Sequence, residues 1–244
     1  MVRGGTLTAI IPVRGGSKGV PRKNLMQLGG MSLLERAIRF AKASPRIDRV
    51  IVSTDDDEMH ALSCAFGVNS KVLRPAPLAS DSATTAAVVE HLITAEPIDS
   101  GHLLILQATS PLRRLADLEA LCKAYEAEEG DAAVSLCALE EPRPEKLKRI
   151  SDGRVAPYLA QAFEGPRQAL PQPYRLNGAF YLISREAFLC EKSFLPAATI
   201  PFIMPGERSH NLDSREDFDI LHAMLETGRW SLEELGNRPW PAPM

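Results

Sequence analysis

The sequence lacks a long hydrophobic run and has no strong excess of either charge. No apolar stretch approaches the ~20 residues that a membrane-spanning helix needs, so we expect no membrane insertion. The formal net charge is −3 over 244 residues, which argues against general binding to nucleic acid or to a membrane surface. We therefore expect the basic residues near the start of the chain to be a local feature.

Paired cysteines are also missing. The four cysteines, Cys64, Cys122, Cys137 and Cys190, stand far apart, and none has the Cys-x-x-Cys spacing. This predicts reduced, mostly buried thiols in a cytoplasmic protein and no zinc site. Residues 1–8 hold one arginine and no long apolar region, so a signal peptide is not expected.

What is present is the composition of a globular α/β protein. Hydrophobic residues make up 45% of the chain and charged residues 24%, and 244 residues suffice for one domain with a full core. Short apolar runs alternate with helical patterns, which predicts a mainly parallel sheet covered by helices on both faces. We expect strands at residues 7–13, 48–54, 72–74, 102–107, 131–136, 178–183 and 199–204, the last at a sheet edge.

Several helix starts are marked by polar residues. Ser32 has Glu35 three residues on, the spacing of a capping box. The acidic run at residues 55–58 could hold a metal ion, but carboxylates at a helix start favour a capping role. Ser82 or Thr84 would cap the helix that begins near residue 84, and Ser214 would cap the last helix.

The alternation breaks between residues 140 and 175. This segment is rich in proline and shows little clean periodicity. Its length exceeds that of an ordinary connection. It predicts an arm, a lid or a binding loop.

Residues 14–24 form the most distinctive stretch. Directly after the first strand, Gly15, Gly16 and Gly19 are interleaved with four cations, which are Arg14, Lys18, Arg22 and Lys23. Backbone N–H groups in such a turn can approach a ligand closely, and the cations favour a polyanion. The spacing matches neither the Walker loop nor Gly-x-Gly-x-x-Gly. A tight connection with a solvated basic surface is the alternative; we favour a triphosphate site.

Five blocks of the chain resemble the CMP-sialate synthetase (acylneuraminate cytidylyltransferase) family. In the family's order they lie at residues 9–24, 73–81, 106–113, 167–181 and 211–218. Ala108 stands where the family usually has proline. Asn211 stands where the family usually has the first acid of an Asp-x-Asp pair, so that only Asp213 is kept.

The resemblance implies a fold and an assembly. The fold would be a three-layer α/β/α Rossmann-like nucleotidyltransferase fold with a mainly parallel sheet, formed by residues 1–244 as a single domain. The arm at about 140–175 would hold a homodimer together and complete the neighbouring subunit's sugar site.

The resemblance also implies a reaction. CTP and a nine-carbon 3-deoxy-2-ulosonic acid, such as sialic or legionaminic acid, would give the CMP-sugar and pyrophosphate, with magnesium or another divalent cation. The implied catalytic residues are Arg14, Lys18 and Asp213, with Asp213 as the metal ligand. The implied CTP-binding residues are Arg14, Ser17, Lys18, Lys23, Asn24, Arg74 and Thr85. The implied sugar-binding residues are Gln107, Arg167, Arg175, Asn177, Tyr181 and Phe194.

These residue types suit that chemistry. Attack at the α-phosphorus needs neutralised phosphates and a stabilised leaving group, which Arg14, Lys18 and a carboxylate-bound magnesium would supply. An arginine fork matches the carboxylate of an acidic sugar, the task of Arg167 or Arg175. Two alternatives stay open. One is transfer to the eight-carbon analogue KDO or to a sugar 1-phosphate, and the other is an inactive nucleotide-binding relative. The choice among nine-carbon sugars and the general base also stay open.

Overall fold

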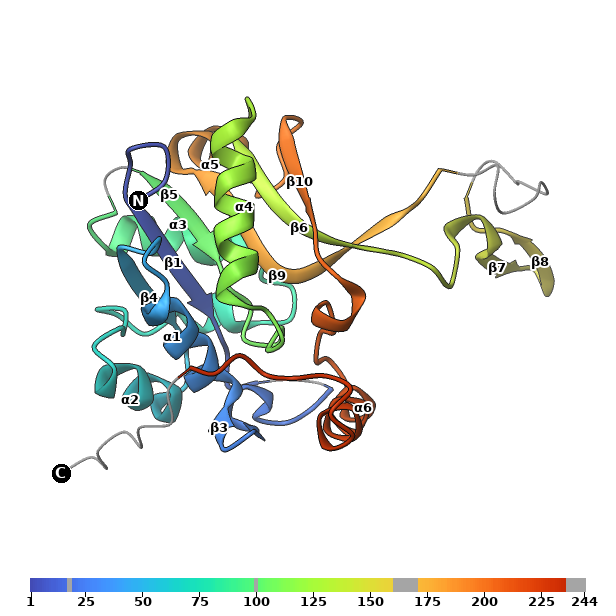
Figure 1. The fold of residues 1–244 in the computed structure, drawn as a ribbon, viewed down its shortest axis with the longest axis horizontal. Helices are drawn as coiled ribbons and strands as arrows, with labels where there is room; N and C mark the ends of the chain where they lie inside the picture. Colours follow the sequence, from blue (N-terminus) through green and yellow to red (C-terminus); the bar gives the residue numbers. More distant parts are fainter. Residues whose placement is uncertain (17–18, 99–100, 160–170, 236–244) are drawn as a thin grey trace.

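A six-stranded sheet forms the centre of the protein (Figure 1). The structure is a computed structural model, and it describes residues 1–16, 19–98, 101–159 and 171–235. The strands, in their order across the sheet, are β10 (Thr199–Ile203), β6 (Ala132–Ala138), β9 (Tyr174–Ser184), β5 (His102–Ile105), β1 (Leu7–Pro12) and β4 (Arg49–Ser53). β9 runs antiparallel to both its neighbours, and the other pairs are parallel. The expected mainly parallel sheet is confirmed.

Two apolar layers cover the sheet because successive side chains of a strand point to opposite faces. In β1, Ile11 joins the larger core cluster and Ile10 the smaller one. The larger cluster is covered by α1 (Leu33–Ala43), α2 (Asp57–Ala65), α4 (Leu115–Ala127) and α6 (Arg215–Glu226). The smaller cluster is covered by α3 (Thr85–Ala95) and α5 (Arg185–Glu191). These layers confirm the α/β/α architecture.

The helix starts follow the local sequence signals. Ser32, Asp56, Thr84 and Ser214 each cap a helix, and each side chain accepts a hydrogen bond from the backbone N–H three residues on. Each cap satisfies one of the N–H groups that have no partner inside the helix. The capping role expected of the acidic run at 55–58 is therefore confirmed, with Asp56 as its cap.

The strand expected at residues 72–74 is wrong. Val72 and Leu73 are each 42% exposed, and the 3-10 turn η2 (Ala76–Ala79) follows. Asn69 alone forms an isolated bridge, with Val52 of β4. Pro75 and Pro77 stop the segment from continuing as a ladder, since proline has no N–H to donate. What remains is one bond from the Arg74 N–H to the Thr54 carbonyl, 2.8 Å long.

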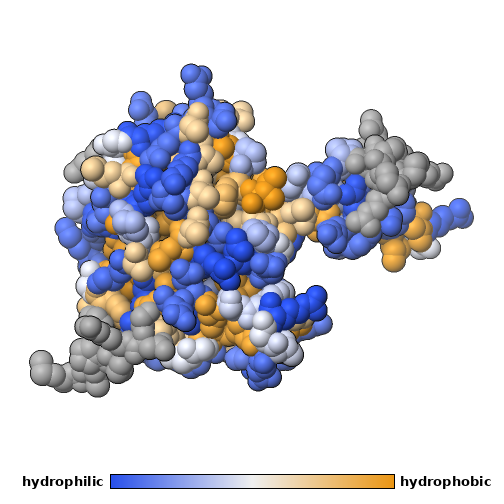
Figure 2. Space-filling view, viewed as in Figure 1, coloured by the Kyte–Doolittle hydropathy of each residue, from blue (hydrophilic) through white to orange (hydrophobic). Residues whose placement is uncertain are grey.

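Residues 139–159, which follow β6, project from the body as an arm (Figure 1). It carries the short turn η3 (Pro144–Lys146) and an antiparallel hairpin of β7 (Lys148–Ser151) and β8 (Arg154–Pro157). Hydrophobic side chains lie exposed on it (Figure 2), with Ile150 82% and Val155 74% exposed. The prediction of an arm over part of 140–175 is confirmed for the residues that the structure describes.

The cysteines differ in their burial. Cys122 and Cys137 are buried, but Cys64 and Cys190 are exposed, so the expectation of mostly buried thiols holds for only half of them. Burial raises the pKa of the Cys122 thiol to about 11. No helix within the described part of the chain is long and apolar enough to cross a membrane.

Candidate active site

A cavity of about 420 Å³ opens where β1 and β5 end. This is the edge at which open α/β sheets usually bind ligands. Segments far apart in the chain meet around it: the loop after β1, the η2 loop, the start of α3 and the segment before α6. Its polar and charged lining residues are Arg14, Lys23, Asn24, Arg74, Ser80, Asp81, Thr85, Gln107, Thr109, Asn211 and Asp213.

Arg14 lies at the mouth of this cavity. Its Nη2 donates to Oδ1 of Asp81 at 2.6 Å, and its Nη1 donates to the Ala79 carbonyl at 3.3 Å. Both partners belong to the η2 loop, so the guanidinium joins the first loop to the second. The side chain remains 31% exposed, which leaves it within reach of a ligand.

Lys23 and Asp213 form an ion pair in the wall of the same cavity. Lys23 Nζ lies 2.9 Å from Asp213 Oδ1, and Asn211 Nδ2 donates to Asp213 Oδ2 at 2.7 Å. The amide nitrogen must face Asp213 because an ionised carboxylate only accepts hydrogen bonds. The amide oxygen of Asn211 lies 3.2 Å from the Ser110 hydroxyl. An amide and a cation therefore orient the Asp213 carboxylate.

Arg74 forms part of the cavity's inner wall. It is only 7% exposed, and its guanidinium donates to the hydroxyl and the carbonyl of Ser53 at the end of β4. Burial, opposed by the charge of Asp55 and aided by that of Arg14, lowers the pKa of Arg74 to about 10. The group therefore stays cationic at neutral pH.

A second cavity of about 190 Å³ adjoins the first. Thr85 and Gln107 line both cavities. The rest of the smaller one is mainly apolar and includes Tyr181 and Phe194, whose rings meet edge to face at a centroid distance of 6.5 Å. Burial raises the pKa of the Tyr181 phenol, which stays protonated and able to donate at neutral pH.

The structure brings most of the sequence-predicted residues together but not all. The larger cavity holds Arg14, Lys23, Asn24, Arg74, Thr85, Gln107 and Asp213, and the smaller one holds Thr85, Gln107, Tyr181 and Phe194. Asn177 is 1% exposed and lines neither cavity, and Arg175 lines a separate cavity beside Met204. Ser17, Lys18 and Arg167 lie outside the described residues. Arg22 turns toward Glu58, 2.5 Å away, and not into the larger cavity.

Sequence reasoning missed two residues. Asp81 pairs with Arg14 at 2.6 Å, although only its place in the block at 73–81 pointed to it. Arg113 is fully buried and donates to the Gln107 and Ala179 carbonyls at 2.7 and 2.8 Å. It thereby fixes the end of β5 against β9. The sequence does not predict this burial, because arginine is usually an exposed residue type.

The donor set near Asp213 bears on metal binding. Within the described ranges, no three or more His, Cys, Asp or Glu side chains are grouped so that they could hold a metal ion. Magnesium needs only one or two protein carboxylates when phosphate oxygens and waters complete its shell. Asp213, 70% exposed at the cavity, offers one carboxylate. The residues therefore fit a magnesium ion that arrives with a nucleotide, and they do not form a self-sufficient metal site.

The described residues thus form an α/β fold with a charged cavity and a mainly apolar one side by side at the strand ends. A sequence model of the cytidylyltransferase family matches residues 8–164, and the chain belongs to that family.

Two relatives show how the similarity is distributed. The N-acylneuraminate cytidylyltransferase of Streptococcus agalactiae serotype V is 32% identical over 212 residues, which are 86% of this chain and 51% of that protein. The CMP-N,N'-diacetyllegionaminic acid synthase of Legionella pneumophila is 28% identical over 232 residues, or 93% of this chain and 99% of that protein. The chain thus spans about half the length of its N-acylneuraminate cytidylyltransferase relatives.

Solved structures agree on the fold. A CMP:2-keto-3-deoxy-manno-octonic acid synthetase, solved in complex with CTP, superposes with a TM-score of 0.67. It covers 91% of this chain and 99% of its own at 17% identity. At that identity the match shows the nucleotidyltransferase fold and no more.

Proposed function

We propose that this chain transfers CMP from CTP to the anomeric hydroxyl of a nine-carbon 3-deoxy-2-ulosonic acid, giving the CMP-sugar and pyrophosphate. Membership of the cytidylyltransferase family supports the use of CTP. The names of the two relatives, which act on acylneuraminate and on a diacetyllegionaminate, support the sugar class. The observation that carries the proposal is that two cavities of different character abut at Thr85 and Gln107.

The larger, charged cavity would take the nucleotide. Arg14 and Lys23 would neutralise the triphosphate, together with Ser17 and Lys18 of the same loop. Arg14 pairs with Asp81 and Lys23 pairs with Asp213, and phosphate oxygens can take the place of these carboxylates. A bound triphosphate would therefore replace the existing ion pairs of Arg14 and Lys23 with new ones to its own oxygens.

Asn24, Arg74 and Thr85 would bind the nucleoside. Arg74 and Asn24 are 7% exposed or less, and Arg74 is anchored to β4. Asn24 donates to the Arg14 carbonyl at 3.4 Å. Such fixed donors suit selection of one base, because groups that are already ordered lose little freedom on binding.

The smaller cavity would take the sugar. Its apolar wall at Tyr181 and Phe194 suits the carbon skeleton or an acyl group, and the Gln107 amide suits the hydroxyls. Arg167 or Arg175 would meet the sugar carboxylate. In this structure Arg175 is exposed and donates to the Ser209 carbonyl at 3.0 Å. Arg175 would have to turn from that bond to reach the sugar.

Magnesium, when bound with CTP, supplies charge neutralisation at the phosphates and leaving group. Asp213 would hold it. Asn211 donates to Oδ2 of that carboxylate and would keep it aimed at the metal when Lys23 turns from Oδ1 to the phosphates.

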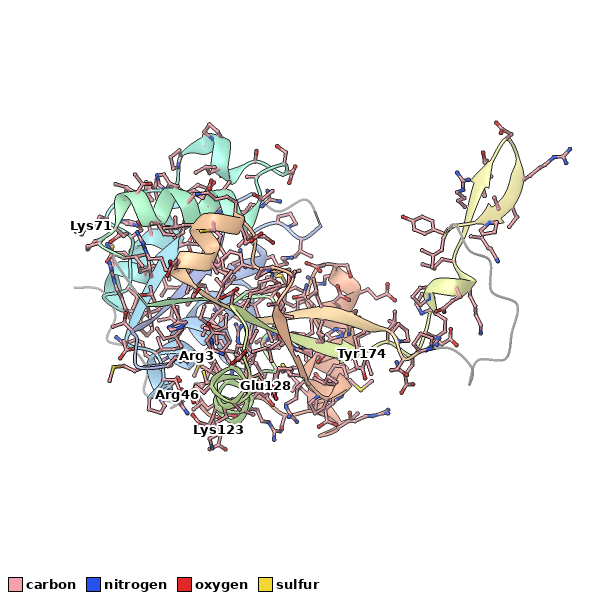
Figure 3. The ribbon with its side chains drawn as sticks, turned by 90° about the horizontal axis from the view of Figure 1, so that it is seen from above. Arg3, Arg46, Lys71, Lys123, Glu128 and Tyr174 are labelled. Atoms are coloured by element: carbon pink, nitrogen blue, oxygen red, sulfur yellow. The ribbon has the colours of Figure 1, made fainter. Side chains whose placement is uncertain are left out.

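A homodimer is part of the proposal. The arm exposes Ile150 and Val155 far from the body, and Tyr174 at its base is 44% exposed (Figure 3). Exposed apolar side chains on a projecting hairpin suit contact with a second copy. Light scattering at working concentration should give twice the chain mass, and a monomer would contradict the dimer. We also propose a cytoplasmic location, which the free thiols suit.

Release of pyrophosphate tests the function. The protein is supplied with CTP, magnesium and, in turn, a sialic acid, a legionaminic acid, KDO and a sugar 1-phosphate. Release with a nine-carbon acid supports the proposal. Pyrophosphate release only with KDO or only with a sugar 1-phosphate would make that compound the substrate in place of a nine-carbon acid. If CTP binds but no acceptor gives release, the chain is an inactive relative. Lys18→Ala should abolish release without unfolding the protein.

A further inference from the structure

β9 contains a large irregularity opposite Ser135. Val134 pairs with Tyr181, and Leu136 pairs with Leu176. One residue of β6 therefore faces the four residues 177–180 of β9. Such bulges bend a strand and re-aim its side chains, often beside an active site. Here the bulge lies directly behind Gln107, because a Cβ on Gly178 would overlap the Gln107 side chain.

Buried polar bonds fill the space that the bulge opens. Ser135, which is fully buried, accepts the N–H of Phe180 at 2.8 Å and donates to Oδ1 of Asn177 at 2.6 Å. The same Asn177 oxygen accepts the N–H of Ala179 at 3.2 Å. The Asn177 amide oxygen therefore links two residues of the bulge region, and it accepts two hydrogen bonds in doing so.

The other end of the Asn177 amide reaches the loop before α6. Its Nδ2 donates to the Ser209 hydroxyl at 2.9 Å, and that hydroxyl donates to the Pro205 carbonyl at 2.9 Å. Ser209 is 1% exposed. The Ser110 hydroxyl, also buried, lies 3.1 Å from the Asn177 carbonyl and 3.2 Å from Oδ1 of Asn211. Asn177 thus joins the sheet to the segment that carries Asn211 and Asp213.

These bonds are incompatible with a contact role in the described conformation. All the polar atoms of the Asn177 side chain have protein partners, and the residue lines neither candidate cavity. Buried side chains with every hydrogen bond made fix one arrangement of the elements they join.

We propose that Asn177 is a positioning residue: through Ser135 it sets the bulge that backs Gln107, and through Ser209 it holds the loop bearing Asn211 and Asp213. The catalytic part of this inference rests on the proposed cytidylyltransferase function. Its structural part, that Asn177 restrains residues 205–214, does not.

The test compares Asn177→Ala and Ser209→Ala with Tyr181→Phe, a matched control in the wall of the sugar cavity. Amide hydrogen exchange of peptides covering 205–214 is measured by mass spectrometry, without substrates. Both network variants should exchange about fivefold faster or more in this segment, the factor that an ordinary lost hydrogen bond gives. Tyr181→Phe should leave the segment unchanged. The double variant should add little to either single one, because both remove the same bond.

Steady-state kinetics give the second readout. Asn177→Ala and Ser209→Ala should lower kcat and raise the magnesium concentration needed for half-maximal rate. The KM for the sugar should change by less than about twofold. A raised sugar KM in Asn177→Ala with unchanged exchange of 205–214 would overturn the proposal and make Asn177 a sugar contact. If Asn177→Ala does not fold, Ser209→Ala carries the test. If the wild type releases no pyrophosphate but both variants exchange faster at residues 205–214, the proposed function is rejected. The restraint of this segment by Asn177 then still stands.

Discussion

Lys23 Nζ and Asp213 Oδ1 lie 2.9 Å apart although 190 residues of sequence separate them. The backbones of their two segments also touch, since a Cβ on Gly19 would come within 2.5 Å of the Asp213 carbonyl oxygen. Glycine at position 19 is what allows this approach. The ion pair therefore joins the cationic loop after β1 to the segment before α6, and the phosphates of the proposed nucleotide would compete with Asp213 for Lys23.

Removal of the Asp213 charge tests the metal role. Asp213→Asn should raise the magnesium concentration for half-maximal pyrophosphate release on the order of tenfold, which corresponds to a loss of about 1.4 kcal/mol in binding. Asp219→Asn is the control, because Asp219 is exposed on α6 and pairs with Arg215. An Asp213→Asn titration that overlays the wild-type curve would remove Asp213 from the metal site.

Removal of the Arg14 guanidinium tests the nucleotide cavity. A charge-assisted hydrogen bond contributes about 1.5–3 kcal/mol, so Arg14→Ala should raise the Kd for CTP about 10- to 100-fold by calorimetry. Arg22→Ala removes the same charge from the same loop, but Arg22 pairs with Glu58 and does not line the cavity. Its effect should stay near twofold, because solvent and salt screen a distant charge. Equal losses in both variants would mean that only the net charge of the loop matters.

A methyl group at Gly178 should disturb the bulge. Gly178 has φ of 76°, a left-handed conformation that glycine adopts freely, and its added Cβ would also lie 2.9 Å from the Ser110 hydroxyl. Gly178→Ala should lower the free energy of unfolding by about 1–3 kcal/mol, as overpacking does, and reduce kcat. Gly153→Ala is the control for backbone strain alone, since that glycine has φ of 71° in the arm and open space around it. If the two variants lose equal stability, crowding against Gln107 is not the cause.

Local signals in the sequence were enough for much of the fold. The caps at Ser32, Thr84 and Ser214 depend on residues three positions away, and the apolar runs of β1 and β5 are buried on both faces. Interactions of such short range leave a pattern in the chain itself. The cations of residues 14–24 likewise predicted the charged cavity that Arg14 and Lys23 line.

The rest depends on partners that are distant in sequence. The run at 72–74 has the residue types of a strand, but the β-bridge to the edge strand β4 forms at Asn69, and Pro75 and Pro77 stop the pairing from continuing. The place of Asn177 depends on the register of β9 against β6, which no periodicity reveals. Asp81 is recognised only when Arg14 is seen beside it. In each case the deciding contact spans more than fifteen residues, beyond the reach of a local pattern.

A bidentate ion pair far from the site predicts how stability changes with pH. Arg46 donates to both carboxylate oxygens of Glu119 at 2.7 and 2.8 Å, on the α4 side of the molecule (Figure 3). The hydrogen bonds from Arg46, reinforced by its charge, hold the pKa of Glu119 at about 2, below its ordinary 4.5. Because the folded-state pKa is the lower one, this stabilisation is complete above pH 4.5 and is lost as pH falls toward 2.

The difference in unfolding free energy between wild type and Glu119→Gln, measured by urea denaturation, should therefore be constant from pH 7 to about 5 and shrink below it. Arg46→Ala should remove the same part of the pH dependence of the unfolding free energy, because the Glu119 carboxylate then has no bidentate partner. The effect should be modest, since the Glu119 side chain is 37% exposed and solvent screens the pair. A difference that is as large at pH 3.5 as at pH 6 would show that Glu119 stabilises the fold by packing and not by its charge.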